Sequence, residues 1–417
     1  MDILKKTRNI LEYGPICDHC LGRQFAQLLS GYDNAERGHV LRTFLALHAD
    51  ASGMTPEEFK AAKQNLLYGF HALDENKYDL APANYEECCI CSGIFSRLDK
   101  IVDRVVKACK DVEFSTFLVG TKLSNKLVQA EETLWEHVGI DYCEPIKAEV
   151  NREIGKLIEK RLEKRADLKK PDINIILDLS EHSRKPVIVE INPIFVYGEY
   201  QKLKRGIPQT KWPSGKYKIS VEQIIAKPFM AKTSGRSHKL HGCGREDIDA
   251  RCLGWRPFVL EIVYPKKRRL DLKKLERTVN KDKRIKVRSL RASNIAEVRK
   301  IKESKAAKTY KCIVSSEKTI SNKELAKLKQ LLDAEIKQRT PQRVEHRRAD
   351  KVRKRRVLSI STKLINSKKF ELTVKTEAGT YIKELISGDN GRTQPSISDI
   401  LGVQCKCESL DVIKIHK

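Results

Sequence analysis

Two short segments far apart in the chain carry side chains that could act together on a substrate. The first is the acidic turn Gly244-Arg245-Glu246-Asp247-Ile248-Asp249, which precedes a predicted strand. The second is Gly379-Thr380-Tyr381-Ile382-Lys383, where the glycine permits a sharp turn and the last residues begin a predicted helix. If the two loops meet, Lys383 can pair with the carboxylate of Asp247. Such pairs occur in active sites and also as purely structural ion pairs.

Two CxxC pairs predict a metal site. Cys17 and Cys20 form the first pair, and Cys88 and Cys91 form the second, on either side of a predicted helical region. A two-residue gap lets one tight turn supply two thiolates, and four thiolates complete a structural zinc site with no open position for a reacting water. The alternative is buried cysteines with accidental spacing. Cys89 is a spare thiol, and the sequence leaves open whether it competes for the metal.

The charge balance predicts a polyanionic partner. Lys and Arg number 82 against 55 Asp and Glu, which gives a formal net charge of +27 in 417 residues. A nucleic acid is the first candidate for such an excess. An anionic membrane is the rival, but the chain has no amphipathic anchor at its start and no apolar run near the about 20 residues that span a bilayer. We therefore expect no membrane partner.

The positive charge is clustered. Residues 339–356 hold nine Lys or Arg and only two acids, and they include Arg347 and Arg348. Arginine is suited to binding phosphates in a bidentate manner, so this segment is predicted to contact nucleic acid. A second cluster, residues 200–212, mixes aromatic and basic side chains that could stack on bases, which favours nucleic acid only slightly over a solvated surface loop.

The coarse pattern of elements predicts a multidomain α+β protein. We expect a helical zinc-binding region at 1–95, a mixed module of helices and strands at 96–232 and a mostly antiparallel sheet with helices at 233–417. The expected helices are 21–47, 52–73, 148–169 and 322–338, the expected strands are 114–120, 173–179, 187–197, 257–264, 309–316, 357–361 and 370–376, and 228–235 reads as a loop.

The N-terminus has no apolar signal core, so we expect a cytoplasmic protein with reduced thiols. Nothing demands an oligomer, and a monomer is expected.

Several separated motifs together resemble the archaeal and eukaryotic tRNA pseudouridine synthases that act on positions 54 and 55 of the TΨC arm. The resemblance spans essentially the whole chain. The matching segments are the first CxxC with Cys20-Leu21-Gly22-Arg23, then Asn151–Lys156, Gly244–Arg251, Trp255–Ile262, Lys308-Thr309-Tyr310, Arg339-Thr340-Pro341, His346-Arg347-Arg348, Gly379–Glu384 and Gly388–Ser396. One departure is Cys243, where a serine is more familiar.

The resemblance implies a zinc-bearing accessory region with a THUMP-type RNA-binding domain, followed by a pseudouridine synthase catalytic domain. It places the nucleophile at Asp247, the active-site aromatic at Tyr310 and the basic partner of the nucleophile at Lys383. Tyr310, Tyr381, Arg245, Arg347 and Arg348 are the expected substrate-binding residues. Two simpler interpretations stay open: Tyr310 could be ordinary core, since it alternates with Cys312 and Val314, and Asp249 could be the functional acid.

The implied chemistry suits these residue types. A carboxylate can act as a nucleophile in covalent catalysis, and a neighbouring Lys or Arg keeps it ionised. The target base must leave the folded arm, at a cost of a few kcal/mol that stacking on an aromatic ring can offset. No redox step or incoming group is involved, so no organic cofactor is expected.

Two other functions are compatible with the basic, cysteine-bearing chain. Another THUMP enzyme, such as a thiouridine synthetase or an RNA methyltransferase, needs a nucleotide or methyl-donor loop, and the sequence has no P-loop and no convincing G-x-G-x-x-G after a strand. A non-catalytic tRNA-binding or chaperone protein would not need Asp247, Tyr310 and Lys383 together. The sequence leaves open whether position 54, position 55 or both are modified.

Overall fold

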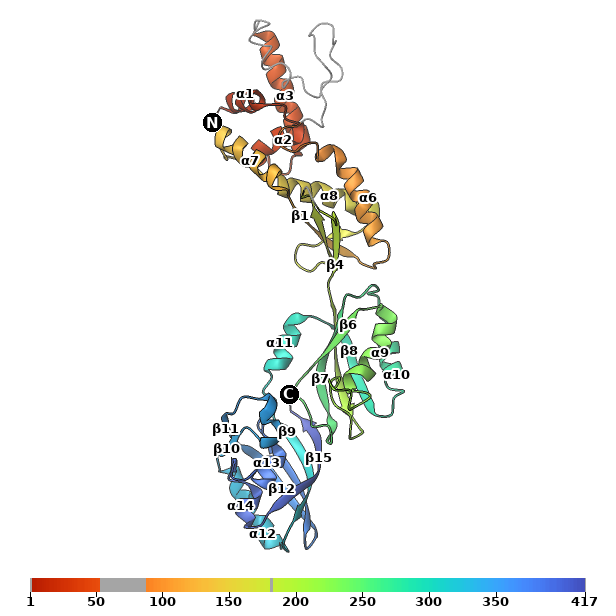
Figure 1. Ribbon diagram of the computed structural model, residues 1–417, viewed down its shortest axis with the longest axis vertical. Coiled ribbons are helices and arrows are strands. Elements are labelled where there is room, and N and C mark those ends of the chain that lie inside the picture. The colour runs from red at the N-terminus through yellow and green to blue at the C-terminus, as the bar shows by residue number, and fades with distance from the viewer. Residues whose placement is uncertain (1, 53–87, 181–182, 417) are drawn as a thin grey trace. The chain divides into compact units, whose positions relative to one another are not determined.

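The structure is a computed structural model that describes residues 2–52, 88–180 and 183–416, and the chain divides into two compact units between Asn192 and Pro193 (Figure 1). The sequence placed the start of the last domain near residue 233. The difference arises because β5 (Ile194–Lys202) pairs with β7 (Arg251–Val263) and β8 (Ile285–Ser293), so the second unit begins where β5 begins. Each unit is described by itself.

The first part of the N-terminal unit is helical. Its helices are α1 (Ile3–Tyr13), α2 (Asp18–Gly22) and α3 (Asn34–Ala51), with a 3₁₀ turn at Arg23–Phe25. The backbones of α2 and α3 touch: a Cβ added to Gly22 would lie 1.8 Å from the carbonyl oxygen of Asn34, so only glycine fits. The predicted helix 21–47 is therefore two helices separated by a turn, and the predicted helix 52–73 lies almost entirely outside the described residues.

The second part of the N-terminal unit is a small sheet packed against helices. The strands are β1 (Thr116–Lys122), β2 (Arg165–Ala166), β3 (Ile173–Asp178) and β4 (Val187–Ile191), in the order β2-β1-β3-β4, and the helices are α6 (Leu98–Cys109), α7 (Asn125–Val138) and α8 (Ile146–Leu162). The central pair β1 and β3 is parallel, and α8 packs on β1. The predicted helix 148–169 ends at Leu162, because Glu163 adopts a left-handed conformation with φ 52°.

An eight-stranded, mostly antiparallel sheet forms the frame of the C-terminal unit, as the sequence predicts. The strand order is β12-β13-β9-β15-β7-β5-β8, and β6 pairs with β7. Only the short contact between β15 and β7 is parallel. The remaining strands of this sheet are β6 (Ser237–Gly242), β9 (Lys308–Ser316), β12 (Val357–Asn366), β13 (Lys369–Thr376) and β15 (Cys405–Ile415).

Helices and a second small sheet complete this unit (Figure 1). The helices are α9 (Val221–Thr233), α10 (Leu272–Val279), α11 (Ile295–Glu303), α12 (Asn322–Ala326), α13 (Ile382–Ser387) and α14 (Ile397–Leu401), with 3₁₀ turns η4 (Lys327–Leu332) and η5 (Gln342–Arg347). The small sheet has the order β11-β10-β14, from β10 (Ile336–Arg339), β11 (Val352–Arg355) and β14 (Thr393–Gln394). Among the described helices, none has the length and apolar content that crossing a bilayer requires.

Two predictions for this unit are wrong in their details. The predicted loop 228–235 lies mostly in helix α9, which Ser220 caps and which contains Pro228, because burial of Ile225 and Phe229 outweighs the lost backbone hydrogen bond. The predicted helix 322–338 gives way to strand β10, where Ile336 and Gln338 are buried while their neighbours are exposed. That period of two is the pattern of a strand.

Candidate active site

The loop that carries Asp247 lies between β6 and β7, and the last residue of β5, Lys202, supports it. The buried ammonium of Lys202 donates hydrogen bonds to the carbonyl oxygens of Asp247 at 2.9 Å and Ile248 at 3.2 Å. The side-chain amide of Gln209 donates to the carbonyl of Gly244 at 3.0 Å. Gly244 has a φ of +79°, and a Cβ there would lie 3.1 Å from Nη1 of Arg256. The loop is therefore fixed in one conformation that requires glycine.

The neighbouring acid, Glu246, points into the protein rather than toward solvent. Its carboxylate forms an ion pair with Arg256 at 3.1 Å and accepts a hydrogen bond from the hydroxyl of Tyr200 at 3.0 Å, and all three side chains are almost fully buried. Arg256 also donates to the carbonyl of Cys243 at 2.7 Å. Glu246 is thus a structural acid, and this anchoring directs Asp247, the next residue, to the other side of the loop.

Two cations from separate segments flank the carboxylate of Asp247. Nη1 of Arg343, in η5, lies 3.1 Å from Oδ1 of Asp247. Nζ of Lys383, in the first turn of α13, lies 3.6 Å from Oδ2. Lys383 is closer to Asp249, whose carboxylate oxygens it contacts at 2.6 and 2.9 Å. The structure thus brings Lys383 to both acids of the loop and adds a second cation, Arg343, that sequence reasoning did not single out.

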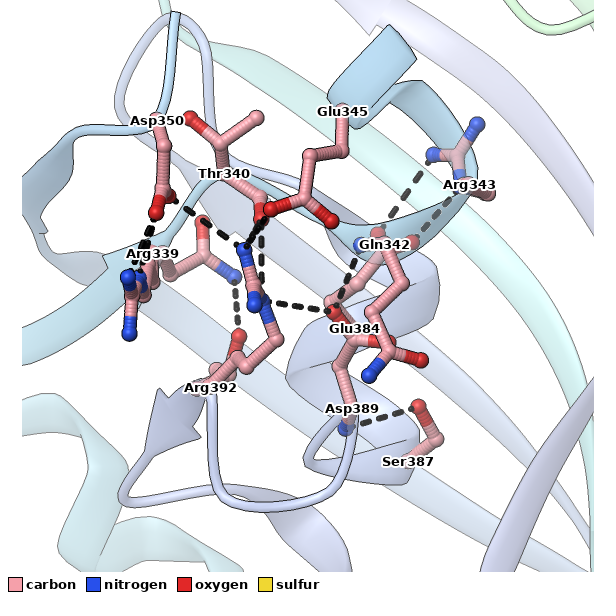
Figure 2. A network of polar contacts seen from close by, with 12 residues as sticks. Arg339, Thr340, Gln342, Arg343, Glu345, Asp350, Glu384, Ser387, Asp389 and Arg392 are labelled. Atoms are coloured by element: carbon pink, nitrogen blue, oxygen red, sulfur yellow. Dashed lines mark hydrogen bonds and ion pairs between the residues drawn. The ribbon is translucent and has the colours of Figure 1, made fainter.

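Arg343 is fixed by a network of polar contacts around η5 (Figure 2). Its Nε donates to the buried carboxylate of Glu384 at 2.6 Å. The turn that carries Arg343 is held by Arg392, whose guanidinium donates to the carbonyl of Thr340 at 2.7 Å and contacts Asp350 at 3.3 Å. The backbone N–H of Gln342 donates to Asp389 at 3.2 Å. The position of Arg343 is therefore determined by Glu384 in α13 and by Asp389 and Arg392, which follow this helix in the chain.

Asp247 opens into a cavity of about 430 Å³, a size typical of small-molecule sites. Its walls combine acids, cations and aromatic rings: Trp212, Arg245, Asp247, Asp249, Arg256, Lys308, Tyr310, Arg343, Arg348, Tyr381 and Lys383 are among the lining residues. Tyr310 is nearly buried, and burial raises the pKa of its hydroxyl to about 12, so it is protonated at neutral pH. Tyr310 lines the cavity, so it is more than a residue of the sheet core.

The remaining predicted substrate-binding residues differ in their placement. Arg245 and Arg348 are exposed at the cavity. Tyr381 is positioned by Gln338, which exchanges two 2.9 Å hydrogen bonds with its backbone. The side chain of Arg347 lies outside the described part of the structure. In the second basic cluster, Tyr200 and Lys202 are fully buried and support the Asp247 loop, so the nucleic-acid interpretation of the cluster does not hold for these two residues.

The four predicted metal ligands meet in the N-terminal unit. The sulfur atoms of Cys17, Cys20, Cys88 and Cys91 all lie within 4.8 Å of one another, and the four side chains are buried. The Cys17 and Cys91 sulfurs are 3.7 Å apart. A tetrahedral ion with metal–sulfur bonds of about 2.3 Å would place its sulfurs about 3.8 Å apart. The cluster could therefore hold a metal ion. Cys89 is exposed and does not belong to it.

The chain is similar to known proteins over nearly its whole length. The family model described as "Pus10, C-terminal" matches residues 195–416, and "Pus10 THUMP domain, archaeal" matches residues 101–178. Curated relatives called "tRNA pseudouridine synthase Pus10" come from Methanopyrus kandleri, 38% identical over 99% of this chain and 98% of the relative, and from Pyrococcus furiosus, 40% identical over the same shares. A solved chain from a Cbf5-Nop10-Gar1 complex is 19% identical, covers 52% of this chain and 48% of that chain, and has a TM-score of 0.31.

Proposed function

The chain belongs to the Pus10 family of tRNA pseudouridine synthases, and we propose that it converts uridine to pseudouridine at position 54, position 55 or both in the TΨC arm of tRNA, with Asp247 as the nucleophile. One observation carries the assignment of the nucleophile. Asp247 is the carboxylate that lines the cavity between Arg343 and Lys383, with Tyr310 in the same cavity.

The reaction breaks the C1′–N1 bond of uridine and makes a C1′–C5 bond. In the proposed path, an oxygen of Asp247 bonds to C1′ as the N1 bond breaks, and the electron pair of that bond leaves with the uracil ring. The ring turns and C5 displaces the carboxylate at C1′. C5 then gives up its proton to solvent and N1 takes up a proton from solvent, so that the product is an isomer of uridine. Arg343 and Lys383 favour the ionised form of Asp247 that the first step needs.

The substrate base must leave its stack to reach the cavity. Unstacking costs a few kcal/mol, and contact with an aromatic side chain can offset part of that cost. Tyr310 and Tyr381 both line the cavity and can supply such contacts. We therefore assign them, with Arg245, Arg347 and Arg348, to substrate binding. The basic 339–356 segment carries η5 and flanks the cavity, which supports a role in gripping the tRNA backbone.

We propose zinc as the ion of the cysteine cluster and a structural role for it. Four thiolates with two-residue gaps are the donor set that zinc prefers, and a site with four protein ligands leaves no position for a reacting water. Within a tRNA-modifying function the chain would work in the cytoplasm, as a monomer and without an organic cofactor.

A non-catalytic tRNA-binding protein is the second candidate, because the basic surface and the cysteine cluster would serve it equally well. Asp247→Ala and the isosteric Asp247→Asn separate the two functions when assayed on a minimal TΨC-arm transcript. We expect no pseudouridine from either variant, with RNA affinity within about threefold of wild type, since the loop backbone is held by Lys202 rather than by the Asp247 side chain. Pseudouridine formation at the normal rate would refute the assignment of the nucleophile, and site-by-site quantification decides between positions 54 and 55.

A further inference from the structure

Lys308 is a buried lysine that lines the cavity containing Asp247, whereas the buried Lys202 does not line it. Lys308 is the first residue of β9, and the burial pattern of that strand places it on the same face as Tyr310, two residues later. Only 7% of Lys308 is exposed, and the residue lines the cavity together with Asp247. Its ammonium group also lies against the Asp247 loop, because a Cβ added to Gly244 would be 3.7 Å from Nζ.

The contacts of Lys308 leave most of its hydrogen-bonding capacity free. An ammonium has three N–H donors, and Nζ of Lys308 donates to the carbonyl oxygen of Ala306 at 3.0 Å. Among the described residues, no carboxylate lies within ion-pair distance of it. Lys202 provides the contrast: three backbone carbonyls surround its ammonium, and Glu246 lies 3.9 Å away.

The environment of Lys308 opposes its positive charge. Burial lowers the pKa of its ammonium, and the nearby guanidinium of Arg256 lowers it further. Burying a charged group without a counter-ion costs stability, and residues retained at such a cost are frequently functional. Arg256 also lines the cavity, but its guanidinium already pairs with Glu246 and donates to the carbonyl of Cys243.

We propose that Lys308 donates a hydrogen bond to a carbonyl oxygen of the target uracil and stabilises the negative charge that the ring acquires when the C1′–N1 bond breaks. This inference rests on the proposed function. The electron pair of the broken bond delocalises over N1 and the two ring oxygens, and a donor already in place at one of those oxygens lowers the barrier without reorganisation. Lys308 transfers no proton. It is a catalytic residue in addition to the nucleophile and the cations beside it.

The test compares Lys308→Met with Lys311→Met in the full-length protein. Lys311 lies on the same strand but is exposed and pairs with Glu371 at 2.8 Å, so it is a matched control. Single-turnover rates are measured with saturating TΨC-arm RNA, and affinities by filter binding. We expect Lys308→Met to slow the reaction about 100- to 1,000-fold, as loss of one preorganised donor does, with unchanged affinity. Lys311→Met should react at the wild-type rate.

Three further measurements keep the test decisive. The melting temperature of Lys308→Met should equal or exceed that of wild type, because an unbalanced buried charge is removed; a much lower value would show a structural role and overturn the inference. Lys308→Arg, which keeps the donor, should recover part of the rate. Replacing O2 or O4 of the target uracil with sulfur, a weaker acceptor, should slow wild type at one of the two positions and have little further effect on Lys308→Met.

The outcomes for the two proposals differ. An active wild type with Lys308→Met reacting at the same rate would overturn the role of Lys308 and leave the proposed function intact. A wild-type protein that makes no pseudouridine in any tRNA would overturn the proposed function itself.

Discussion

The guanidinium of Arg343 connects Asp247 to Glu384. Nη1 of Arg343 lies 3.1 Å from Oδ1 of Asp247, and Nε donates to Oε1 of Glu384 at 2.6 Å. Glu384 is buried in α13, next to Lys383, so the buried acid fixes the guanidinium, and the guanidinium in turn fixes the carboxylate in the cavity. The short contacts of Lys383 are with Asp249 rather than with Asp247. Arg343 is therefore the closer of the two cations that hold Asp247.

Removing Arg343 should slow catalysis more than it weakens RNA binding. Arg343→Met leaves Asp247 with only the longer contact to Lys383, so its carboxylate is less well positioned and less well stabilised as an anion. We expect a fall of about 10- to 100-fold in the single-turnover rate. Glu384→Gln should show a smaller loss, because it loosens the guanidinium without deleting it. Lys337→Met is the control, since Lys337 is exposed on β10, just before the same basic segment, and does not line the cavity. Equal rates for Arg343→Met and Lys337→Met at saturating RNA would contradict this role.

Asp249→Asn should remain active and should change the acid stability of the protein. Burial opposes ionisation of Asp249, but hydrogen bonds from Lys383 outweigh it and lower the pKa of the carboxyl below its ordinary value. A lowered pKa in the folded state contributes stability above the unfolded pKa of about 3.9, and the contribution is lost as pH falls through the folded value. The melting temperature of wild type should thus fall more steeply below pH 4 than that of Asp249→Asn. Because the Asp249 side chain is largely exposed, the difference should be small.

Activity in the same variant tests which acid of the loop is the nucleophile. Asp249 lines the cavity, but its carboxylate is bound to Lys383 on the exposed side. We expect Asp249→Asn to retain activity within about tenfold of wild type, since Arg343 still holds Asp247. If Asp249→Asn made no pseudouridine while Asp247→Asn stayed active, Asp249 and not Asp247 would be the nucleophile.

Sequence patterns predicted well those features that depend on local spacing. The strands carrying Tyr310 and preceding Lys383 follow from alternating apolar residues, and the two CxxC pairs meet in space as their spacing indicates. Arg343 was missed because its contact with Asp247 spans 96 residues and depends on how η5 is held by Arg392. No local pattern distinguishes it from the other arginines of its segment.

The same limit explains the misread residues of the cluster 200–212. Tyr200 and Lys202 look like exposed RNA-binding residues because they stand among lysines and arginines. In the fold both are buried against the Asp247 loop. The hydroxyl of Tyr200 donates to Glu246, and the ammonium of Lys202 donates to backbone carbonyls of the loop. Burial of a lysine is set by tertiary partners distant in sequence, so composition alone assigns it to the surface. Lys308 escaped notice as a site residue for the same reason.

Cys17→Ser should lose the bound metal and destabilise the N-terminal unit. Cys17 is buried among the other three thiols, and metal-binding free energy contributes directly to folding in small cysteine sites. We expect about one zinc per wild-type chain by elemental analysis, markedly less in the variant, and earlier thermal unfolding. Cys89→Ser is the control, because Cys89 follows the ligand Cys88 in the sequence but is exposed and outside the cluster. Equal zinc content in wild type and Cys17→Ser would exclude the cluster as the metal site.

Neutralising the exposed part of the basic segment should reduce the salt dependence of tRNA binding. Arg348, Lys351 and Arg356 are exposed, whereas Arg353 is engaged with Thr340 at 2.9 Å and Arg339 with Asp350. Each phosphate contact contributes about 0.7 to 0.9 to the slope of log K against log salt, so the triple alanine variant should lower that slope by about 2 to 3. A matched triple variant of Lys323, Lys327 and Lys329, which are exposed on α12 and η4 and do not line the cavity, keeps the net charge equal. If the two variants change the slope equally, the effect comes from overall charge and the 339–356 segment has no specific contact with the phosphates.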